Sequence, residues 1–304
     1  MTTIARHRTV AVGVDGSDSA LQAVRWAAKL AARDGCRLRL VHAYQLPLGL
    51  PSGAFHQESV LDALREQGKR WLDEAREAAA LVDPALVADT GLVAMPVAEA
   101  LLHDAENLAM IILGTRGLSA LAGVLVGCTS VAIAANAACP VVIVRGSAPD
   151  HEPLDTGPVV VGIDGTPVSE SAIALAFAEA SARGADLVAV HAWAESAFEL
   201  ALAGNNAPLD LQVLRQEAAE TLAERLAGWQ EKYPDVHVVR DVVHDRPGRA
   251  LRRLAPTAQL VVVGRRRRGS FTSLLLGSTS QDLLHHAQCP VAVTRPENPT
   301  LTRR

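Results

Sequence analysis

Short apolar runs alternate with longer amphipathic stretches along the whole chain. The run VAVGV at 10–14 is typical of a strand buried on both faces of a parallel sheet. Ser17 then offers a helix N-cap, and apolar residues recur at helical spacing until Gly35, which favours a helix end. The same alternation predicts further strands at 38–43, 85–90, 108–113 and 140–144, with helices at 57–81, from Met95-Pro96 onward, and at 127–137.

The pattern occurs twice. TVAVGVDGSDSA at 9–20 returns as PVVVGIDGTPVS at 158–169, and CPVVIVR at 139–145 returns as CPVAVTR at 289–295. Because the offsets are 149 and 150 residues, the repeated unit is a whole domain rather than a solenoid repeat. We predict a first domain at 1–147, a linker rich in Gly, Pro and acidic residues at 148–157, a second domain at 158–295, and a loose tail at 296–304.

Each copy predicts an α/β fold. Strands that alternate with helices form a parallel sheet with helices on both faces, and the ligands of such sheets bind beyond the carboxyl ends of the strands. The residues directly after the first strand are Asp15-Gly16 in one copy and Asp164-Gly165 in the other. In the second copy, Thr166-Pro167 is typical of an N-cap followed by proline at the first helical position. We therefore expect the functional site at this corner of each sheet.

Composition excludes several classes of protein. Hydrophobic residues make up 49% of the chain but aromatic residues only 3%, so the core is aliphatic. Lys and Arg number 13 against 15 Asp and Glu in residues 1–150, and 16 against 18 in residues 151–304, which gives the net charge of −4. This even balance excludes an overall electrostatic footprint for nucleic acid or an anionic membrane. The four cysteines form no disulfide framework, and no signal peptide or membrane span is evident, so we expect a cytoplasmic protein.

The loop after the fourth strand of the first copy is rich in glycine. Gly114, Gly117 and Gly127 permit a close approach of the backbone to a ligand. The helix that begins after Gly127 presents free N–H groups and a positive dipole end, which together form a natural phosphate site. Thr129 and Ser130 add hydroxyl groups at the same place.

The spacing G-x2-G-x9-G followed by a small hydroxylic residue resembles the ATP-binding loop of the universal stress protein family. The first copy has all three glycines, but Cys128 stands where the family has Ser or Thr. The second copy has Gly264, Gly277 and Ser278, but Arg267 stands where the second glycine belongs. The VGVDGS and VGIDGT turns, the VHA strand ends and the CPVVIV-type last strands are also similar to the family. The resemblance covers nearly the whole chain, in the tandem form found in actinobacteria.

The resemblance implies two Rossmann-like domains, each with a five-stranded parallel sheet of order 3-2-1-4-5. It also implies a non-enzymatic ATP-binding homodimer with a regulatory role in stress or growth control. The resemblance also allows Mg²⁺ to bridge the phosphates of the bound ATP. In this family the aspartates accept hydrogen bonds from the ribose or adenine, backbone groups at the second strand face adenine, and the glycine loop with Ser278 binds phosphate. The positions assigned to nucleotide are Gly13, Asp15, Val41, His42, Gly114, Thr115, Arg116, Gly117, Gly127, Cys128 and Thr129, then Gly162, Asp164, Val190, His191, Gly264, Arg265, Arg266, Arg268, Gly269, Gly277, Ser278 and Thr279.

Structural explanations compete with these roles. Asp15 is equally suited to capping the first helix, and the glycines to a simple helix-entry turn. His42 and His191 are better explained as packed or backbone-bonded side chains than as catalytic groups. Cys139 and Cys289 have the character of small core residues. The arginines at 265–268 suit either a solvated loop or the pairing of an anion.

Two other functions remain open at this point. One is a slow ATPase or phosphotransfer enzyme, for which Arg116 and Arg266 are the candidate arginine fingers. The other is a nucleotide-free dimerisation scaffold, which the departures at Cys128 and Arg267 favour. The motifs G-x4-G-K-[ST] and G-x-G-x-x-G are both absent, which excludes a P-loop and a dinucleotide fingerprint. Because Arg267 replaces a glycine, we also expect the second site to bind ATP more weakly than the first.

Overall fold

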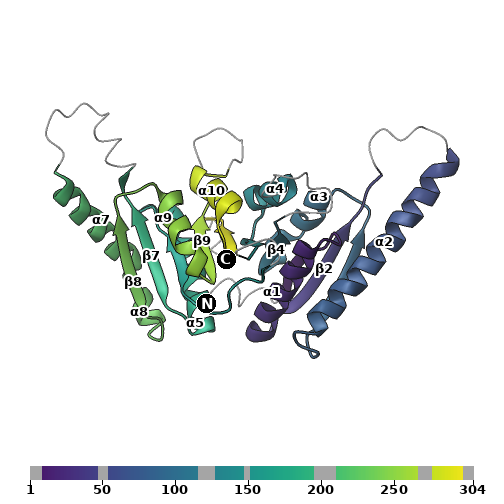
Figure 1. Ribbon diagram of the computed structural model, residues 1–304, viewed down its shortest axis with the longest axis horizontal. Helices are drawn as coiled ribbons and strands as arrows, with labels where there is room; N and C mark the ends of the chain where they lie inside the picture. The colour runs from purple at the N-terminus through teal and green to yellow at the C-terminus, as the bar shows by residue number, and fades with distance from the viewer. Residues whose placement is uncertain are drawn as a thin grey trace, which may run out of the picture. The chain divides into compact units, whose positions relative to one another are not determined.

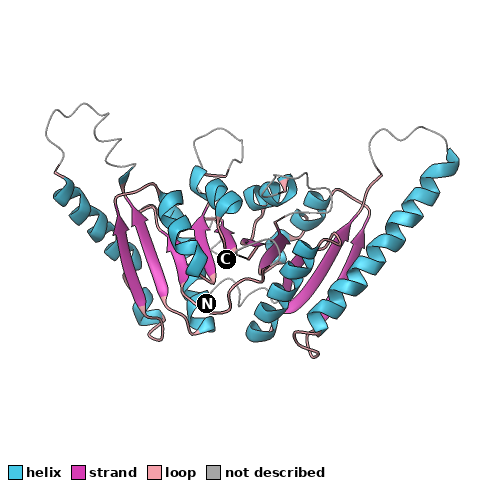
Figure 2. Cartoon of the chain, viewed as in Figure 1, coloured by secondary structure: helices cyan, strands magenta, loops and turns pink. Residues whose placement is uncertain are grey.

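The computed structural model describes residues 9–46, 54–115, 127–146, 151–194, 210–265 and 276–296, with the backbone alone at 54–57. The chain divides into two compact units, and the division falls after Arg145. Figures 1 and 2 show the alternation of strands and helices in each unit.

Unit 1 follows the predicted order of elements. Its described elements are β1 (Thr9–Gly13), α1 (Asp18–Asp34), β2 (Arg37–Ala43), α2 (Ala54–Ala80), β3 (Ala88–Val93), α3 (Val97–Leu102), the 3-10 turn η2 (Ala105–Asn107), β4 (Met110–Gly114), α4 (Cys128–Asn136) and β5 (Val141–Val144).

Unit 2 repeats this order with small differences. Its described elements are β6 (Val159–Gly162), η3 (Pro167–Ser169), α5 (Glu170–Arg183), β7 (Leu187–Ala192), α7 (Leu211–Leu226), α8 (Trp229–Lys232), β8 (Val238–Val243), α9 (Pro247–Leu254), η4 (Ala255–Thr257), β9 (Leu260–Gly264), α10 (Ser278–His286) and β10 (Val291–Thr294).

Within each unit the strands pair in parallel. The order is β3-β2-β1-β4-β5 in unit 1 and β8-β7-β6-β9-β10 in unit 2. Both orders are 3-2-1-4-5, which confirms the predicted fold. In unit 1 α1 and α2 cover one face of the sheet while α3 and α4 cover the other, and α5, α7, α9 and α10 repeat this arrangement in unit 2 (Figure 1). The strand order reverses beside β1 and beside β6, so the carboxyl ends of these strands are the expected ligand positions.

The central strands are buried on both faces, as their apolar runs predict. Val10, Ile111, Val160 and Val261 have no exposed surface. Helix α5 buries the predicted face Ile173, Ala176, Phe177 and Ala180 in the same way. The cores are therefore aliphatic layers on either side of each sheet.

The third strand lies further along the chain than predicted. Its bounds are Ala88–Val93 rather than 85–90. Asp83 accounts for the shift, because its carboxylate accepts the Ala85 N–H (2.9 Å) and its carbonyl accepts the Leu86 N–H (3.1 Å). These bonds hold a turn where the apolar pattern predicted a strand.

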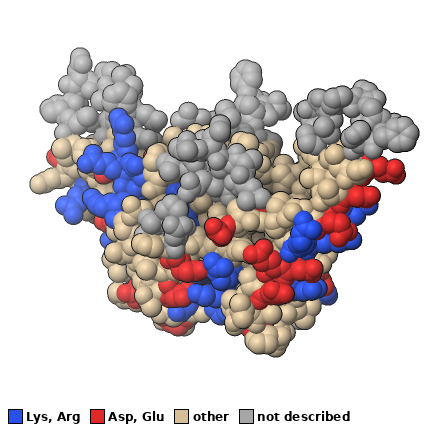
Figure 3. Space-filling view, turned by 45° about the vertical axis from the view of Figure 1, so that its right-hand side comes forward, with Lys and Arg blue, Asp and Glu red and all other residues tan. Residues whose placement is uncertain are grey.

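The surface carries charges of both signs. Along α2, Asp62, Glu66 and Asp73 each form an ion pair with a cation three residues later. Acidic and basic side chains are accordingly interspersed on the forward right-hand side of Figure 3. No helix in the described part of the chain has the length and apolar character needed to cross a membrane.

Candidate functional site

The turn after β1 fixes a carboxylate at the carboxyl end of the sheet. Gly16 has a φ of +78°, and a Cβ at this position would overlap the Trp71 ring. Oδ1 of Asp15 accepts hydrogen bonds from the N–H (3.1 Å) and the hydroxyl (2.6 Å) of Ser17. The Ser17 hydroxyl oxygen in turn accepts the Ala20 N–H (3.1 Å). Ser17 therefore caps α1, as predicted, and the alternative in which Asp15 caps the helix is wrong.

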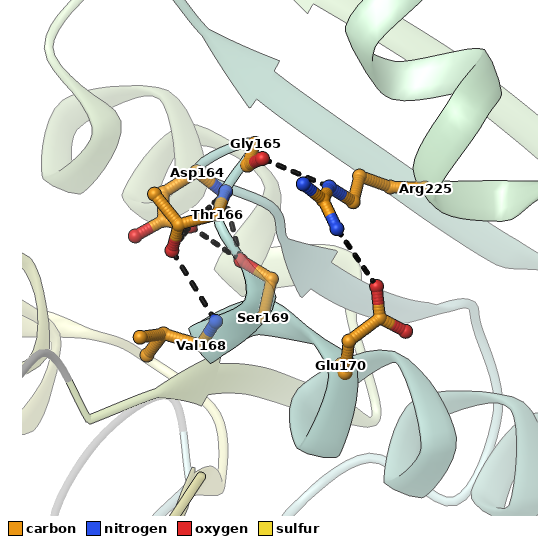
Figure 4. A network of polar contacts seen from close by, with 7 residues as sticks. All are labelled: Asp164, Gly165, Thr166, Val168, Ser169, Glu170 and Arg225. Carbon is orange, nitrogen blue, oxygen red and sulfur yellow. Dashed lines mark hydrogen bonds and ion pairs between the residues drawn. The ribbon is translucent and has the colours of Figure 1, made fainter.

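The equivalent turn in unit 2 holds its carboxylate with one more donor (Figure 4). Oδ1 of Asp164 accepts the Thr166 N–H (2.9 Å), the Thr166 hydroxyl (2.7 Å) and the Ser169 hydroxyl (2.7 Å). Oδ2 points away from these three donors in Figure 4. Gly165 has the same φ of +78° as its counterpart. The predicted N-cap is confirmed, because the Thr166 hydroxyl accepts the Val168 N–H (3.3 Å) at the start of η3.

A residue that the sequence analysis missed contacts this turn from α7. Nε of Arg225 donates to the Gly165 carbonyl oxygen (2.8 Å), and its Nη1 lies 3.3 Å from Oε1 of Glu170. Thr221, one helical turn earlier, also faces Gly165: its Cγ2 lies 2.8 Å from where a Cβ would be. No local pattern identifies Arg225, because its partners lie 55 and 60 residues away along the chain.

Histidines at the ends of β2 and β7 form hydrogen bonds to the backbone directly after β1 and β6. His42 Nδ1 lies 2.7 Å from the Val14 carbonyl oxygen, and His191 Nδ1 lies 2.7 Å from that of Ile163. Since a carbonyl oxygen only accepts, each Nδ1 carries the hydrogen. Both rings are buried, which confirms the interpretation of packed, backbone-bonded histidines. The backbone carbonyls of the preceding valines, Val41 and Val190, accept the N–H groups of Val14 and Ile163.

Some of the predicted glycines serve packing. At Gly114 a Cβ would overlap Ser19 on α1, and at Gly264 it would lie 2.9 Å from the Val168 carbonyl oxygen. At Gly13 and Gly162 a Cβ would lie 2.6 Å and 2.8 Å from leucine side chains. These four glycines allow helices and side chains to approach the strand ends, a packing role that the sequence analysis did not predict.

Gly127 is different, because none of the described residues comes within ordinary clashing distance of a Cβ at this position. Its φ is −66°, and the nearest atom to a Cβ there would be the Thr115 carbonyl oxygen, 3.8 Å away. That carbonyl accepts the Gly127 N–H (2.8 Å). The described residues thus leave the backbone at this helix start accessible, and a ligand that binds backbone N–H groups requires such access.

Helices α4 and α10 begin without a side-chain cap. Their N-caps are Gly127 and Gly277, and no side chain of the described residues caps the first N–H groups. The Ser130 and Ser280 hydroxyls instead donate to the carbonyls of Gly114 and Gly264, at 3.2 and 3.5 Å. The free N–H groups and the positive dipole end at each helix start suit an anion.

In unit 2 these features enclose one pocket of about 370 Å³. This volume lies within the range of small-molecule sites, about 300–1,000 Å³. The turn after β6, the end of β7, the end of β9 and the starts of α9 and α10 all contribute to its wall. The predicted site residues that line it are Gly162, Asp164, Val190, His191, Gly264, Gly277, Ser278 and Thr279. Residues that were not predicted also line it, namely Ile163, Thr166, Val168, Ser169, Ala192, Pro247, Leu251, Val263 and Ser280.

The remaining predicted positions divide into two groups. Thr115 and Arg265 are described and lie buried directly after β4 and β9, while Cys128 and Thr129 open α4, with Cys128 exposed. Arg116, Gly117, Arg266, Arg267, Arg268 and Gly269 lie outside the described residues.

The described residues offer neither a metal cage nor a nucleophilic core thiol. No three His, Cys, Asp or Glu side chains in the described ranges come together to hold a metal ion. Cys36, Cys139 and Cys289 are buried, and burial raises the pKa of the Cys139 thiol to about 12. The core interpretation of Cys139 and Cys289 is confirmed.

Comparison with known proteins identifies the family. A sequence profile of the universal stress protein family matches residues 6–145 and again residues 156–295. A universal stress protein of Mycobacterium tuberculosis is 39% identical over 293 residues, covering 95% of this chain and 98% of its own. One from Mycolicibacterium smegmatis is 38% identical over 303 residues, covering 97% and 100%. The crystal structure of a universal stress protein from Archaeoglobus fulgidus shares the fold, with a TM-score of 0.66, 18% identity and coverage of 96% and 100%. The chain belongs to the universal stress protein family, in tandem form.

Proposed function

We propose that each unit binds an adenine nucleotide, ATP, beyond the carboxyl ends of its strands, and that the protein acts as a regulatory binder rather than an enzyme. The observation that carries this proposal is the pocket of unit 2. There an oriented carboxylate, an apolar strand end and an uncapped helix start share one cavity. These are the three kinds of surface that a ribose, a purine base and a phosphate chain require.

The phosphates would bind at the start of α10. Gly277, Ser278 and Thr279 line the pocket, and no side chain occupies their N–H groups as a cap. Backbone N–H groups at a helix start bind phosphate through hydrogen bonds and through the helix dipole. In unit 1 the open space at Gly127 supports the same use of α4.

The sugar would bind at Asp164. Hydrogen bonds from Thr166 and Ser169 to Oδ1 orient this carboxylate in the pocket wall (Figure 4). A carboxylate accepts hydrogen bonds from hydroxyl groups such as those of a sugar. The end of β7, with Val190, His191 and Ala192 along the pocket wall, offers the base a largely apolar surface.

The lining favours binding over fast hydrolysis. Among the described residues its titratable side chains are Asp164 and His191, which the proposal places at the sugar and the base rather than at the start of α10. A general base must lie within hydrogen-bond reach of the water that attacks the terminal phosphate. The proposal is therefore that occupancy by ATP, rather than its turnover, is what the protein reports to its partners.

Calorimetric titration with Mg-ATP tests the proposal. The unaltered chain should bind, and Asp164→Ala should lower the affinity of one site about 10- to 150-fold, as expected for a hydrogen bond to a charged group. Asp186→Ala is the matched control, because Asp186 is exposed and pairs with His237. No binding by the unaltered chain at millimolar ATP would contradict the proposal and favour a nucleotide-free scaffold. Phosphate release at several turnovers per minute would favour the slow ATPase.

The proposal includes a homodimer. The apolar last strands of the two repeats, 140–144 and 290–294, have the composition of edges that pair with other strands. Light scattering at micromolar concentration should give about twice the chain mass of 32.1 kDa. A mass of one chain would contradict the dimer and leave the nucleotide sites unaffected.

A further inference from the structure

We propose that Arg225 is a positioning residue of the second nucleotide site. From α7 it holds the peptide group between Gly165 and Thr166, and through that group it aims the Asp164 carboxylate. The inference rests on the proposed function, because it concerns the carboxylate assigned to the sugar.

One peptide group in this turn is hydrogen-bonded at both ends. Its carbonyl oxygen, on Gly165, accepts a hydrogen bond from Arg225 Nε (2.8 Å). Its N–H, on Thr166, donates to Asp164 Oδ1 (2.9 Å). A peptide group is planar, so fixing the direction of the carbonyl also fixes the direction of the N–H. Arg225 therefore acts on Asp164 without touching it, as Figure 4 shows.

The guanidinium is itself held in place. Arg225 Nη1 lies 3.3 Å from Oε1 of Glu170, at the start of α5, and the two side chains are 30% and 44% exposed. Thr221 contacts the same turn from one helical turn earlier on α7. Helix α7 thus meets the turn at two points and can transmit its own displacement to the carboxylate.

Unit 1 has no arginine at the position of Arg225 and therefore provides an internal control. One repeat earlier, Ala75 stands in place of Arg225 and Leu21 in place of Glu170. Ala75 is fully buried, and the ring of Trp71, in place of Thr221, packs directly on Gly16. The Asp15 turn is therefore supported from α2 by apolar packing.

Hydrogen exchange read in peptides spanning residues 163–170 and 14–21, with and without Mg-ATP, tests the inference at each site separately. Arg225→Met removes the donor and keeps an apolar stem of similar reach. Arg225→Lys restores a cationic donor. Arg215→Met is the control, because Arg215 is an exposed residue of the same helix. The double variant Arg225→Met with Asp164→Ala separates action through Asp164 from a general loss of stability.

In the ligand-free protein, Arg225→Met should speed exchange in 163–170 and leave 14–21 unchanged. The ATP concentration that half-protects 163–170 should rise about 5- to 20-fold, and Arg225→Lys should recover part of this loss. The loss should vanish in the Asp164→Ala background. Unchanged exchange in ligand-free Arg225→Met, or an equal loss with and without Asp164, would overturn the inference. If the unaltered chain gains no protection from ATP, the proposed function fails, while exchange in the ligand-free variants still decides whether Arg225 holds the turn.

Discussion

The two copies present the same Asp-Gly turn and support it in different ways. In unit 1 the turn lies under Trp71, whose ring also meets the His42 ring edge-on at 5.1 Å. In unit 2 Thr221 and Arg225 take the corresponding places, and a charged hydrogen bond replaces the aromatic contact. Salt screens a partly exposed charged contact but has little effect on apolar packing. The stability of the second turn should therefore depend on salt concentration more than that of the first.

The features common to both copies define what the site needs. Each has a carboxylate that accepts a hydroxyl two residues later, at 2.6 Å for Asp15 and 2.7 Å for Asp164. Each has a histidine Nδ1 at 2.7 Å from a carbonyl at the end of the first strand. The two copies therefore share the aspartate turn and the histidine that binds the strand end, and they differ in the side chains of α2 and α7 that pack against the turn.

The largest expected effect comes from adding a methyl group beneath Trp71. In Gly16→Ala a residue with a side chain must adopt a left-handed φ, and its methyl group overlaps the indole ring. We therefore expect a loss of about 2–5 kcal/mol in the free energy of unfolding. Gly165→Ala should lose about 1–3 kcal/mol, because the nearest obstacle is the Thr221 methyl group. Gly35→Ala is the control, with a φ of +65° and no atom within 4 Å of the added group. Denaturant unfolding measures all three. A cost at Gly16 equal to that at Gly35 would refute the aromatic support.

Removing the first carboxylate should have the next largest effect. Asp15→Ala should weaken ATP binding at the first site about 10- to 150-fold, because a hydrogen bond to a charged group is lost. Asp18→Ala is the control, since Asp18 is an exposed residue of the adjacent helical turn. Calorimetry that finds equal affinities for Asp15→Ala and the unaltered chain would reduce Asp15 to a partner of Ser17.

The glycine missing from the second loop predicts a smaller change. Arg267 stands where the first copy has Gly117, and both positions lie outside the described residues. If the phosphate loop requires a positive φ at this position, a residue with a side chain costs about 1–2 kcal/mol there. Arg267→Gly should therefore raise the ATP affinity of the second site about 5- to 30-fold. A titration in which the variant binds no more tightly would show that the arginine compensates by pairing with phosphate.

The smallest effect concerns the first residue of α4 and of α10. Cys128→Ser gives the first site the hydroxyl that Ser278 provides in the second, and one neutral hydrogen bond is worth about 1 kcal/mol. We expect a gain in ATP affinity of about fivefold at the first site, and a similar loss at the second for Ser278→Cys. Identical affinities across this exchange would remove both residues from the phosphate site.

Sequence periodicity predicts the fold because local and global preferences agree along most of the chain. Val10, Ser17 and Gly35 mark a strand, a cap and a helix end, and the structure uses each in that way. The third strand was placed wrongly because the turn at Asp83 depends on hydrogen bonds to Ala85 and Leu86 that apolar patterning does not encode.

Contacts between residues far apart along the chain limit how much of the site can be predicted from local sequence patterns. Asp15, Asp164 and the glycine loops were identified from their places after strands, but Arg225 acts on a turn 60 residues away. Glu179 shows the same limit in the core. The side chain is only 1% exposed and lies 3.0 Å from Arg183, which also bonds to Gln259. Such residues gain their roles from partners that only the folded chain brings together.

Native mass spectrometry of the Mg-ATP-saturated protein tests the central claim most directly, because it counts nucleotides on each chain. The account predicts two ATP per unaltered chain, and one each for Asp15→Ala and Asp164→Ala at a concentration between the strong and weakened affinities. The double variant should bind none at that concentration. A chain that carries no ATP, or single variants that both still carry two, would contradict the assignment of one carboxylate-anchored nucleotide site to each unit.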